Sequence, residues 1–137
     1  MGNIGLNSDD LLDHYLLTGD KDSLEAARGL AEHILRCSPW SRSARAVGWP
    51  LAQIARWYDE THDERFLLRA QELVCAARVF TRPRRGVFDE HHGNMSYAGA
   101  IPFMTGYLAY GLIRYHQATG DPGGCELLCD LADGLLA

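Results

Sequence analysis

The side chains best suited to acid–base chemistry lie in one polar stretch, residues 84–96, and directly after it. The stretch holds four consecutive titratable residues and is followed by a tyrosine: Asp89, Glu90, His91, His92 and Tyr97. Carboxylates, imidazoles and phenols are the groups that proteins use as general acids and bases. Adjacent residues point in different directions, so Asp89 and Glu90 do not make a catalytic pair by themselves. A solvated polar loop is the structural alternative for the same residues.

A carboxylate pair would instead combine Asp89 or Glu90 with Asp9 or Asp10, which precede the first apolar helical stripe. We take Asp10 as the partner, and His92 or Tyr97 as the group that would abstract a proton. The two neighbouring histidines alone do not complete a metal-ligand set. The sequence therefore predicts neither a metal nor a cofactor.

A second group of residues has the composition of a ligand-binding surface. Aromatic rings and guanidinium groups occur together between residues 40 and 49, at Trp40, Arg42, Arg45 and Trp49. Tryptophan offers a flat face, and arginine binds carboxylates with two parallel hydrogen bonds. We assign these four residues to binding, together with His91. Their structural alternative is a hydrophobic plug over the end of a helix bundle, with the arginines paired to acidic side chains.

A recurring corner shows which elements position these residues. It spans residues 15–20, 58–63 and 115–121, with the pattern Tyr-x-x-Thr-Gly-Asp in its first copy. Each copy follows an apolar helix-like run and precedes another run with Ala and Leu at helical spacing. No alternation typical of strands appears. We predict an all-α fold of three antiparallel helical hairpins, with the corners at one end and the long connections at the other.

Local signals place the helix ends. We expect Ser8 or Asp9 to cap the first helix, Asp22 the second and Asp63 the fourth. The third helix starts inside residues 40–49 or near Pro50, and Gly123-Gly124 leads to the last helix. The run from residue 97 to 115 is apolar on nearly all sides, which predicts a helix that is buried all round.

Composition bounds the class of protein. The chain has 137 residues, 47% of them hydrophobic, which suits one domain over residues 1–137. Its formal net charge of −5 excludes a general nucleic-acid footprint. No apolar run approaches the roughly 20 residues of a membrane span, and no leader is evident, which favours a cytoplasmic location. Four cysteines without a CxxC pair are expected to be buried thiols.

The corner pattern, followed each time by an Ala-rich helix, resembles the six-hairpin (α/α) toroid glycosidase superfamily. Residues 9–20, 45–51 and 102–104 are most similar to a bacterial polysaccharide-lyase-like branch, related to exo-acting rhamnogalacturonan lyases. The resemblance implies half of an (α/α)6 toroid and a carbohydrate-active role, as a polysaccharide lyase or glycoside hydrolase, with an anionic oligosaccharide as ligand. The chain departs from this pattern in two ways. It supplies three hairpins of six, and it has Gly5, Leu6 and Asn7 where the branch has a histidine or tryptophan.

Three situations account for half a toroid: a fragment of a larger chain, a remnant without activity, or a homo-oligomer in which two copies close the ring. The alternative function is a non-catalytic helical-repeat scaffold that binds a partner protein. A deep pocket that gathers an arginine of residues 42–45 with Asp89 or Glu90 and Asp9 or Asp10 would favour the sugar site. A flat face would favour the scaffold.

Overall fold

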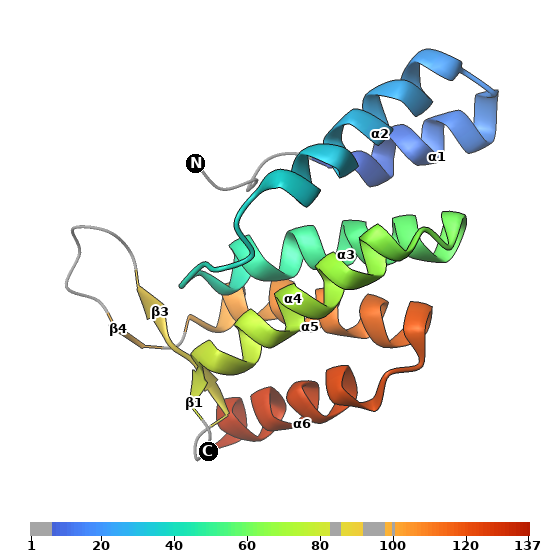
Figure 1. Ribbon diagram of the computed structural model, residues 1–137. Helices are drawn as coiled ribbons and strands as arrows, with labels where there is room; N and C mark the ends of the chain where they lie inside the picture. Colours follow the sequence, from blue (N-terminus) through green and yellow to red (C-terminus); the bar gives the residue numbers. More distant parts are fainter. Residues whose placement is uncertain (1–6, 83–85, 92–97, 100) are drawn as a thin grey trace.

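The computed structural model describes residues 7–82, 86–91, 98–99 and 101–137, and within them six helices account for nearly all regular structure (Figure 1). The helices are α1 (Ser8–Thr18), α2 (Lys21–Arg36), α3 (Ala44–Thr61), α4 (Glu64–Phe80), α5 (Pro102–Thr119) and α6 (Pro122–Leu136). The strands have two residues each: β1 (Thr81–Arg82) pairs antiparallel with β2 (Val87–Phe88), and β3 (Glu90–His91) with β4 (Ala98–Gly99). The predicted all-α class with three hairpins is confirmed.

The three corners share one hydrogen-bond arrangement. In the first, the Thr18 hydroxyl donates to the His14 carbonyl at 2.6 Å and accepts the Asp20 N–H at 3.2 Å. The same two bonds recur at the threonines and aspartates of the other corners, 61 with 63 and 119 with 121. The residue between them is left-handed in every case, with φ of 75° at Gly19, 56° at His62 and 69° at Gly120. Each corner therefore provides hydrogen-bond partners, from its own residues, for backbone groups that would otherwise be unpaired at the helix ends.

This arrangement corrects several predicted helix starts. Asp20, rather than Asp22, caps α2, because an aspartate directly after the left-handed residue reaches the first free N–H groups of the next helix. Asp121 caps α6 in the same way, so this helix begins at Pro122, ahead of the two glycines. Asn7 caps α1. The Asp63 cap of α4 is confirmed.

Helix α3 begins earlier than Pro50 and contains it. Ser43 is the N-cap residue, and Pro50 lies buried in the second turn. The first long connection is therefore only residues 37–43, and Arg45 and Trp49 belong to a helix. The corners lie together at one end of the stack and the connections at the other, as predicted (Figure 1).

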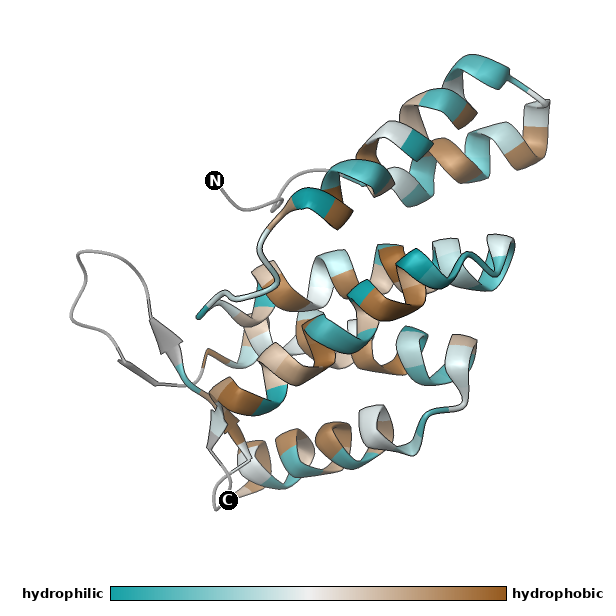
Figure 2. Cartoon of the chain, viewed as in Figure 1, coloured by the Kyte–Doolittle hydropathy of each residue, from teal (hydrophilic) through white to brown (hydrophobic). Residues whose placement is uncertain are grey.

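Helices α3 and α5 pack directly on each other at two glycines. A Cβ atom on Gly48 would lie 2.4 Å from the Leu108 Cα, and one on Gly111 would lie 2.4 Å from the Gly48 carbonyl oxygen. Helix α4 packs on α3, and α6 packs on α5. Apolar residues are concentrated where these helices face one another (Figure 2). We call α1, α3 and α5 the inner row and the other three helices the outer row.

The first hairpin joins the second through polar contacts. The Ser8 N–H donates to Gln53 Oε1 at 2.7 Å, and Trp57 Nε1 donates to the Ser8 hydroxyl at 3.1 Å. Arg65 of α4 pairs with Glu32 of α2 at 3.0 Å. These bonds fix where α1 begins relative to the middle of α3.

Two predictions about burial are wrong. Helix α5 is not buried on all sides: Phe103 is 61% exposed and Tyr110 44%, because no other helix of the described structure covers that side. The cysteines are not buried thiols, since Cys75, Cys125 and Cys129 are exposed and Cys37 is half-buried. No described helix is long and apolar enough to cross a membrane.

Candidate functional site

The acid–base stretch is only partly described. His92 and Tyr97 lie outside the described residues. Glu90 and His91 form β3, opposite Gly99 and Ala98, with only their backbone described. Asp89 is half-buried; its N–H donates to the Phe80 carbonyl at 2.7 Å, and its carboxylate accepts from Arg42 Nη2 at 3.0 Å. Asp89 and Arg42 therefore form an ion pair that ties the two long connections together.

The predicted binding residues separate into two places. Trp40 and Phe80 make a T-shaped contact with ring centroids 6.3 Å apart, and the Arg42 guanidinium lies 5.7 Å from the centroid of the Phe80 ring. Trp49 instead packs against α5, with its ring centroid 5.5 Å from that of Tyr107. The two tryptophans thus belong to different surfaces.

Arg45, Trp49 and Arg56 share one face of α3, because spacings of four and seven residues return to the same side of a helix. Leu51 follows Trp49 by two residues, points to nearly the opposite side and is fully buried. On α5, Tyr110 precedes Leu112 by two residues and therefore points to nearly the opposite side. Leu112 is fully buried and lies at the contact with α6. Trp49 and Tyr110 therefore both lie on the side of the inner row that faces away from the outer row.

An aromatic groove runs between α3 and α5 on this side. It measures about 420 Å³ and is lined by Trp49, Phe103, Gly106, Tyr107 and Tyr110. The Phe103 and Tyr107 ring centroids are 5.4 Å apart, and those of Trp49 and Tyr110 are 6.5 Å apart. Four of its five lining residues are aromatic and its exposed lining is nearly all apolar, which is the composition of a stacking platform.

A charged cluster lies on the same side, nearer the corners. Asp13 of α1 forms an ion pair with Arg56 of α3, and the Arg56 hydrogen bond lowers the pKa of the Asp13 carboxyl. Burial raises the pKa of the Asp9 carboxyl, and the charges of Arg56 and of Arg114 on α5 offset this only in part. Asp9 Oδ1 is buried and accepts no hydrogen bond from the described residues. Such a carboxyl is biased toward its neutral, proton-donating form.

We call these residues the inner face; its members are Asp9, Asp13, Arg45, Trp49, Arg56, Phe103, Tyr107, Tyr110 and Arg114. The buried Arg45 Nε has no hydrogen-bond partner among the described atoms. Asp10, the predicted catalytic aspartate, is exposed beside Asp9. The described contacts do not join Asp9 or Asp10 to Asp89, which lies at the connections with Arg42.

Most of the inner face was not predicted from the sequence. Phe103, Tyr107 and Tyr110 recur at helical spacing, which we interpreted as part of a buried helix. Arg56 and Arg114 carried no local signal, because only the packing of α1, α3 and α5 brings them near Asp9 and Asp13. Among the described residues, no group of three or more His, Cys, Asp or Glu side chains is placed to hold a metal ion.

No family model and no curated protein matches this sequence. The fold is similar to that of the GH76A α-1,6-mannanase from Salegentibacter sp. HEL1_6, with a TM-score of 0.71 and 19% identity over 95% of this chain. Two inactive variants of that enzyme match equally well. One carries asparagine at two adjacent aspartates and is bound to α-1,6-mannotriose (TM-score 0.71). The other carries alanine at the same two positions and is bound to α-1,6-mannotetrose (TM-score 0.72).

The chain spans only 44–45% of the length of these mannanase structures. The matches agree with the predicted toroid glycosidase resemblance at the level of fold, and they do not support its lyase-like branch over others. The match covers 95% of this chain, whose three hairpins form an inner and an outer row. Three hairpins are about half of a six-hairpin ring. The chain has the fold of half an (α/α)6 toroid of the kind found in the α-1,6-mannanase.

Proposed function

We propose that this chain is half of a carbohydrate-active, glycoside-hydrolase-like toroid and that its inner face forms half of the sugar-binding cup. The observation that carries the proposal is the position of the aromatic groove and of the half-buried Asp9, whose Oδ1 is buried, on one side of the inner row. In a closed ring of hairpins, this side faces the interior. Aromatic faces stack on sugar rings, while carboxyl and guanidinium groups bond to hydroxyls.

The side chains favour hydrolysis over elimination. A glycoside hydrolase needs one carboxylic acid that keeps its proton and a second carboxylate. The raised pKa of Asp9 suits it to the first role. Asp10 is its exposed neighbour, and the two form the chain's one Asp-Asp sequence. Because adjacent side chains on a helix diverge, Asp10 is a separate candidate for the second role and not an opposed partner of Asp9 across the bond. The mannanase variants that lack two adjacent aspartates are inactive, which supports testing this pair first.

A complete cup requires a second half-ring. We propose that a second copy of this chain or the remainder of a longer chain supplies it. Exposed apolar residues of the inner row would then be covered, among them Leu16 and Leu17 on α1 and Ile113 on α5. Sedimentation over a range of concentrations should show a dimer; a strict monomer at high concentration would exclude the second copy.

The decisive experiment measures binding and product formation together. Neutral α-1,6-manno-oligosaccharides and anionic pectic oligosaccharides are titrated against the parent, Trp49→Ala and, as a control on the outer row, Glu126→Gln. Trp49→Ala should weaken binding by about tenfold, whereas Glu126→Gln should match the parent. Asp9→Asn should abolish any hydrolysis while the sugar still binds.

Unsaturated products would show lyase chemistry in place of hydrolysis. Absence of binding to every saccharide, in both monomeric and dimeric preparations, would reject the carbohydrate role and favour the protein-binding scaffold.

A further inference from the structure

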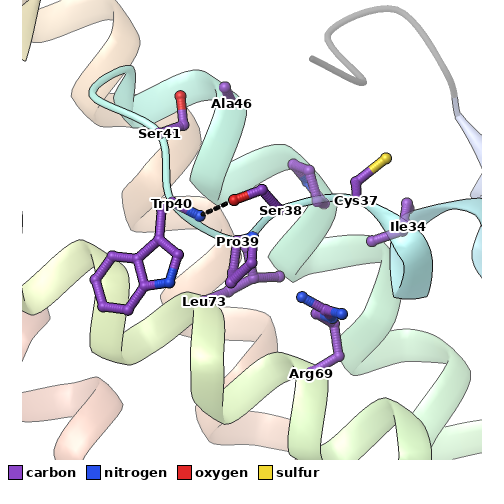
Figure 3. Close-up of a pocket in the computed structure, with 10 residues that line it drawn as sticks. Ile34, Cys37, Ser38, Pro39, Trp40, Ser41, Ala46, Arg69 and Leu73 are labelled. Atoms are coloured by element: carbon purple, nitrogen blue, oxygen red, sulfur yellow. Dashed lines mark hydrogen bonds between the residues drawn. The ribbon is translucent and has the colours of Figure 1, made fainter. Parts of the chain in front are cut away.

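Trp40 borders a hollow that is separate from the inner face. The hollow measures about 370 Å³ and lies between the C-terminal end of α2, residues 37–41, the first two turns of α3 and α4 (Figure 3). A second hollow of about 290 Å³ shares Pro39, Trp40 and Arg69 with it and continues along α4 to Glu72 and Cys75. Figure 3 shows Trp40 on one side of Pro39 and Arg69 on the other. The two hollows form a groove on the outer side of the first two hairpins.

The aromatic wall of this groove is accessible and held in place. Trp40 is 53% exposed, although the edge-to-face contact with Phe80 fixes one side of its ring. The backbone N–H of Trp40 donates to the Ser38 hydroxyl at 3.2 Å, which orders the connection next to Pro39. An indole that is held by a T-shaped ring contact and is about half exposed offers a flat surface without first having to be ordered.

The opposite wall carries both hydrogen-bond donors and acceptors but no net charge. Arg69 Nη1 lies 3.0 Å from Glu72 Oε2, and Arg69 also donates to the Leu35 carbonyl. Arg69 is mostly buried and is held by these two bonds, whereas the Glu72 side chain is 56% exposed. A paired guanidinium and carboxylate favour an uncharged ligand with several hydroxyl groups over an anion or a cation.

We propose that this groove is a second saccharide-binding site, in which a neutral pyranose ring stacks on Trp40 and its hydroxyls bond to Glu72 and Arg69. Two consecutive hairpins of this chain build the whole groove, so completion of the ring leaves it open. The site does not depend on the inner face being catalytic. A ligand held here would bind to the outside of the toroid, at the connection end.

The three indole N–H signals in a nitrogen–proton correlation spectrum separate this site from the inner face. Trp40 reports the groove, Trp49 reports the inner face, and Trp57 is an internal control because its Nε1 donates to the buried Ser8. Titration with α-1,6-mannotriose and with a second neutral oligosaccharide should shift the Trp40 signal saturably and leave Trp57 unchanged. The Trp40 shift should persist in Trp49→Ala, which removes the aromatic platform of the inner face.

Glu72→Gln tests the charge balance. It leaves Arg69 without its carboxylate partner, so binding of a neutral sugar at Trp40 should weaken by about threefold to tenfold, while glucuronate, a sugar acid, should begin to shift the Trp40 signal. Gln71→Ala, at an exposed neighbouring position of α4, is the matched control and should behave like the parent.

Each outcome bears on one site. A Trp40 signal that no neutral saccharide shifts at millimolar concentration overturns the proposal, as does a parent protein that responds only to sugar acids. A shift at Trp40 without one at Trp49, in monomeric and dimeric preparations alike, supports this site and contradicts the inner-face proposal. A shift at Trp49 without one at Trp40 supports the inner-face proposal and overturns the proposal of this second site.

Discussion

Gly48 and Gly111 meet backbone to backbone where α3 packs against α5. Because a Cβ on Gly111 would lie 2.4 Å from the Gly48 carbonyl oxygen, relief of the clash requires the two helices to separate. The same close approach brings Trp49 of α3 to Tyr107 and Tyr110 of α5. These two glycines therefore set both the core of the half-toroid and the width of its aromatic groove.

Replacement of Gly111 by alanine should destabilise the fold by about 3 kcal/mol, because the methyl group meets backbone rather than a side chain that can move. Gly29→Ala is the control: it lies on the exposed side of α2, and a Cβ added there would have no atom within 4 Å. That control should stabilise the protein by about 0.5–1 kcal/mol. Urea unfolding of both variants measures the difference, and equal effects would contradict the close packing.

Asp9→Asn should raise stability at neutral pH. Burial raises the pKa of the folded Asp9 carboxyl, so its contribution to stability is present at acid pH and is lost as pH rises from the unfolded pKa through the folded one. The amide cannot ionise and avoids this loss. Thermal unfolding at pH 4 and pH 7 checks the prediction, with the exposed Asp10→Asn as control. An Asp9→Asn protein less stable than the parent at pH 7 would contradict it.

Tyr115→Phe should weaken the third corner by about 1 kcal/mol at neutral pH. The fully buried Tyr115 donates its hydroxyl to Asp121, the N-cap residue of α6, and this bond lowers the pKa of the Asp121 carboxyl. Its contribution is present above the unfolded aspartate pKa of about 4 and is lost as pH falls through the folded value. The variant should therefore lose less stability than the parent on acidification. The half-exposed Tyr110→Phe should keep the parent's acid dependence.

His62→Gly should stabilise the second corner by about 0.5–1 kcal/mol. His62 is the one non-glycine with positive φ among the described residues, and the equivalent positions of the other corners are glycines. The stacking of Tyr58 on His62 is lost in the variant and reduces the gain. Gly19→Ala at the matching position should destabilise the first corner. A thermal shift of the same sign in both variants would contradict the shared geometry.

Three of the four cysteines should react in the native state. Cys75, Cys125 and Cys129 are exposed, and Cys37 is half-buried. The pKa of the Cys129 thiol is raised, first by desolvation and then by its neighbour Cys125, so less of it is thiolate at pH 8. Alkylation followed by mass spectrometry should find Cys75 modified before Cys129. Modification of Cys129 before Cys75 would contradict the raised pKa of the Cys129 thiol.

The sequence by itself determined the parts of this protein that depend on neighbours in the chain. A corner of threonine, a left-handed residue and aspartate satisfies its hydrogen bonds within seven residues, so three copies identify three hairpins without any knowledge of packing. The all-α class and the separation of corners from connections follow from the same local rules. The Thr-Gly-Asp pattern also carried the toroid resemblance, which is a statement about fold.

Tertiary structure alone decided which side chains share a surface. Trp40 and Trp49 are nine residues apart and were assigned to one site, but the start of α3 at Ala44 places one on a connection and the other on a helix. The exposed side of α5 could not be predicted either, because an apolar helix is buried only where a partner exists. Asp9 lies half-buried beside α3 because Gln53 and Trp57 hold the neighbouring Ser8 there. Contacts between residues 34 or more positions apart leave no periodic signal in a sequence, and such contacts build both candidate sites.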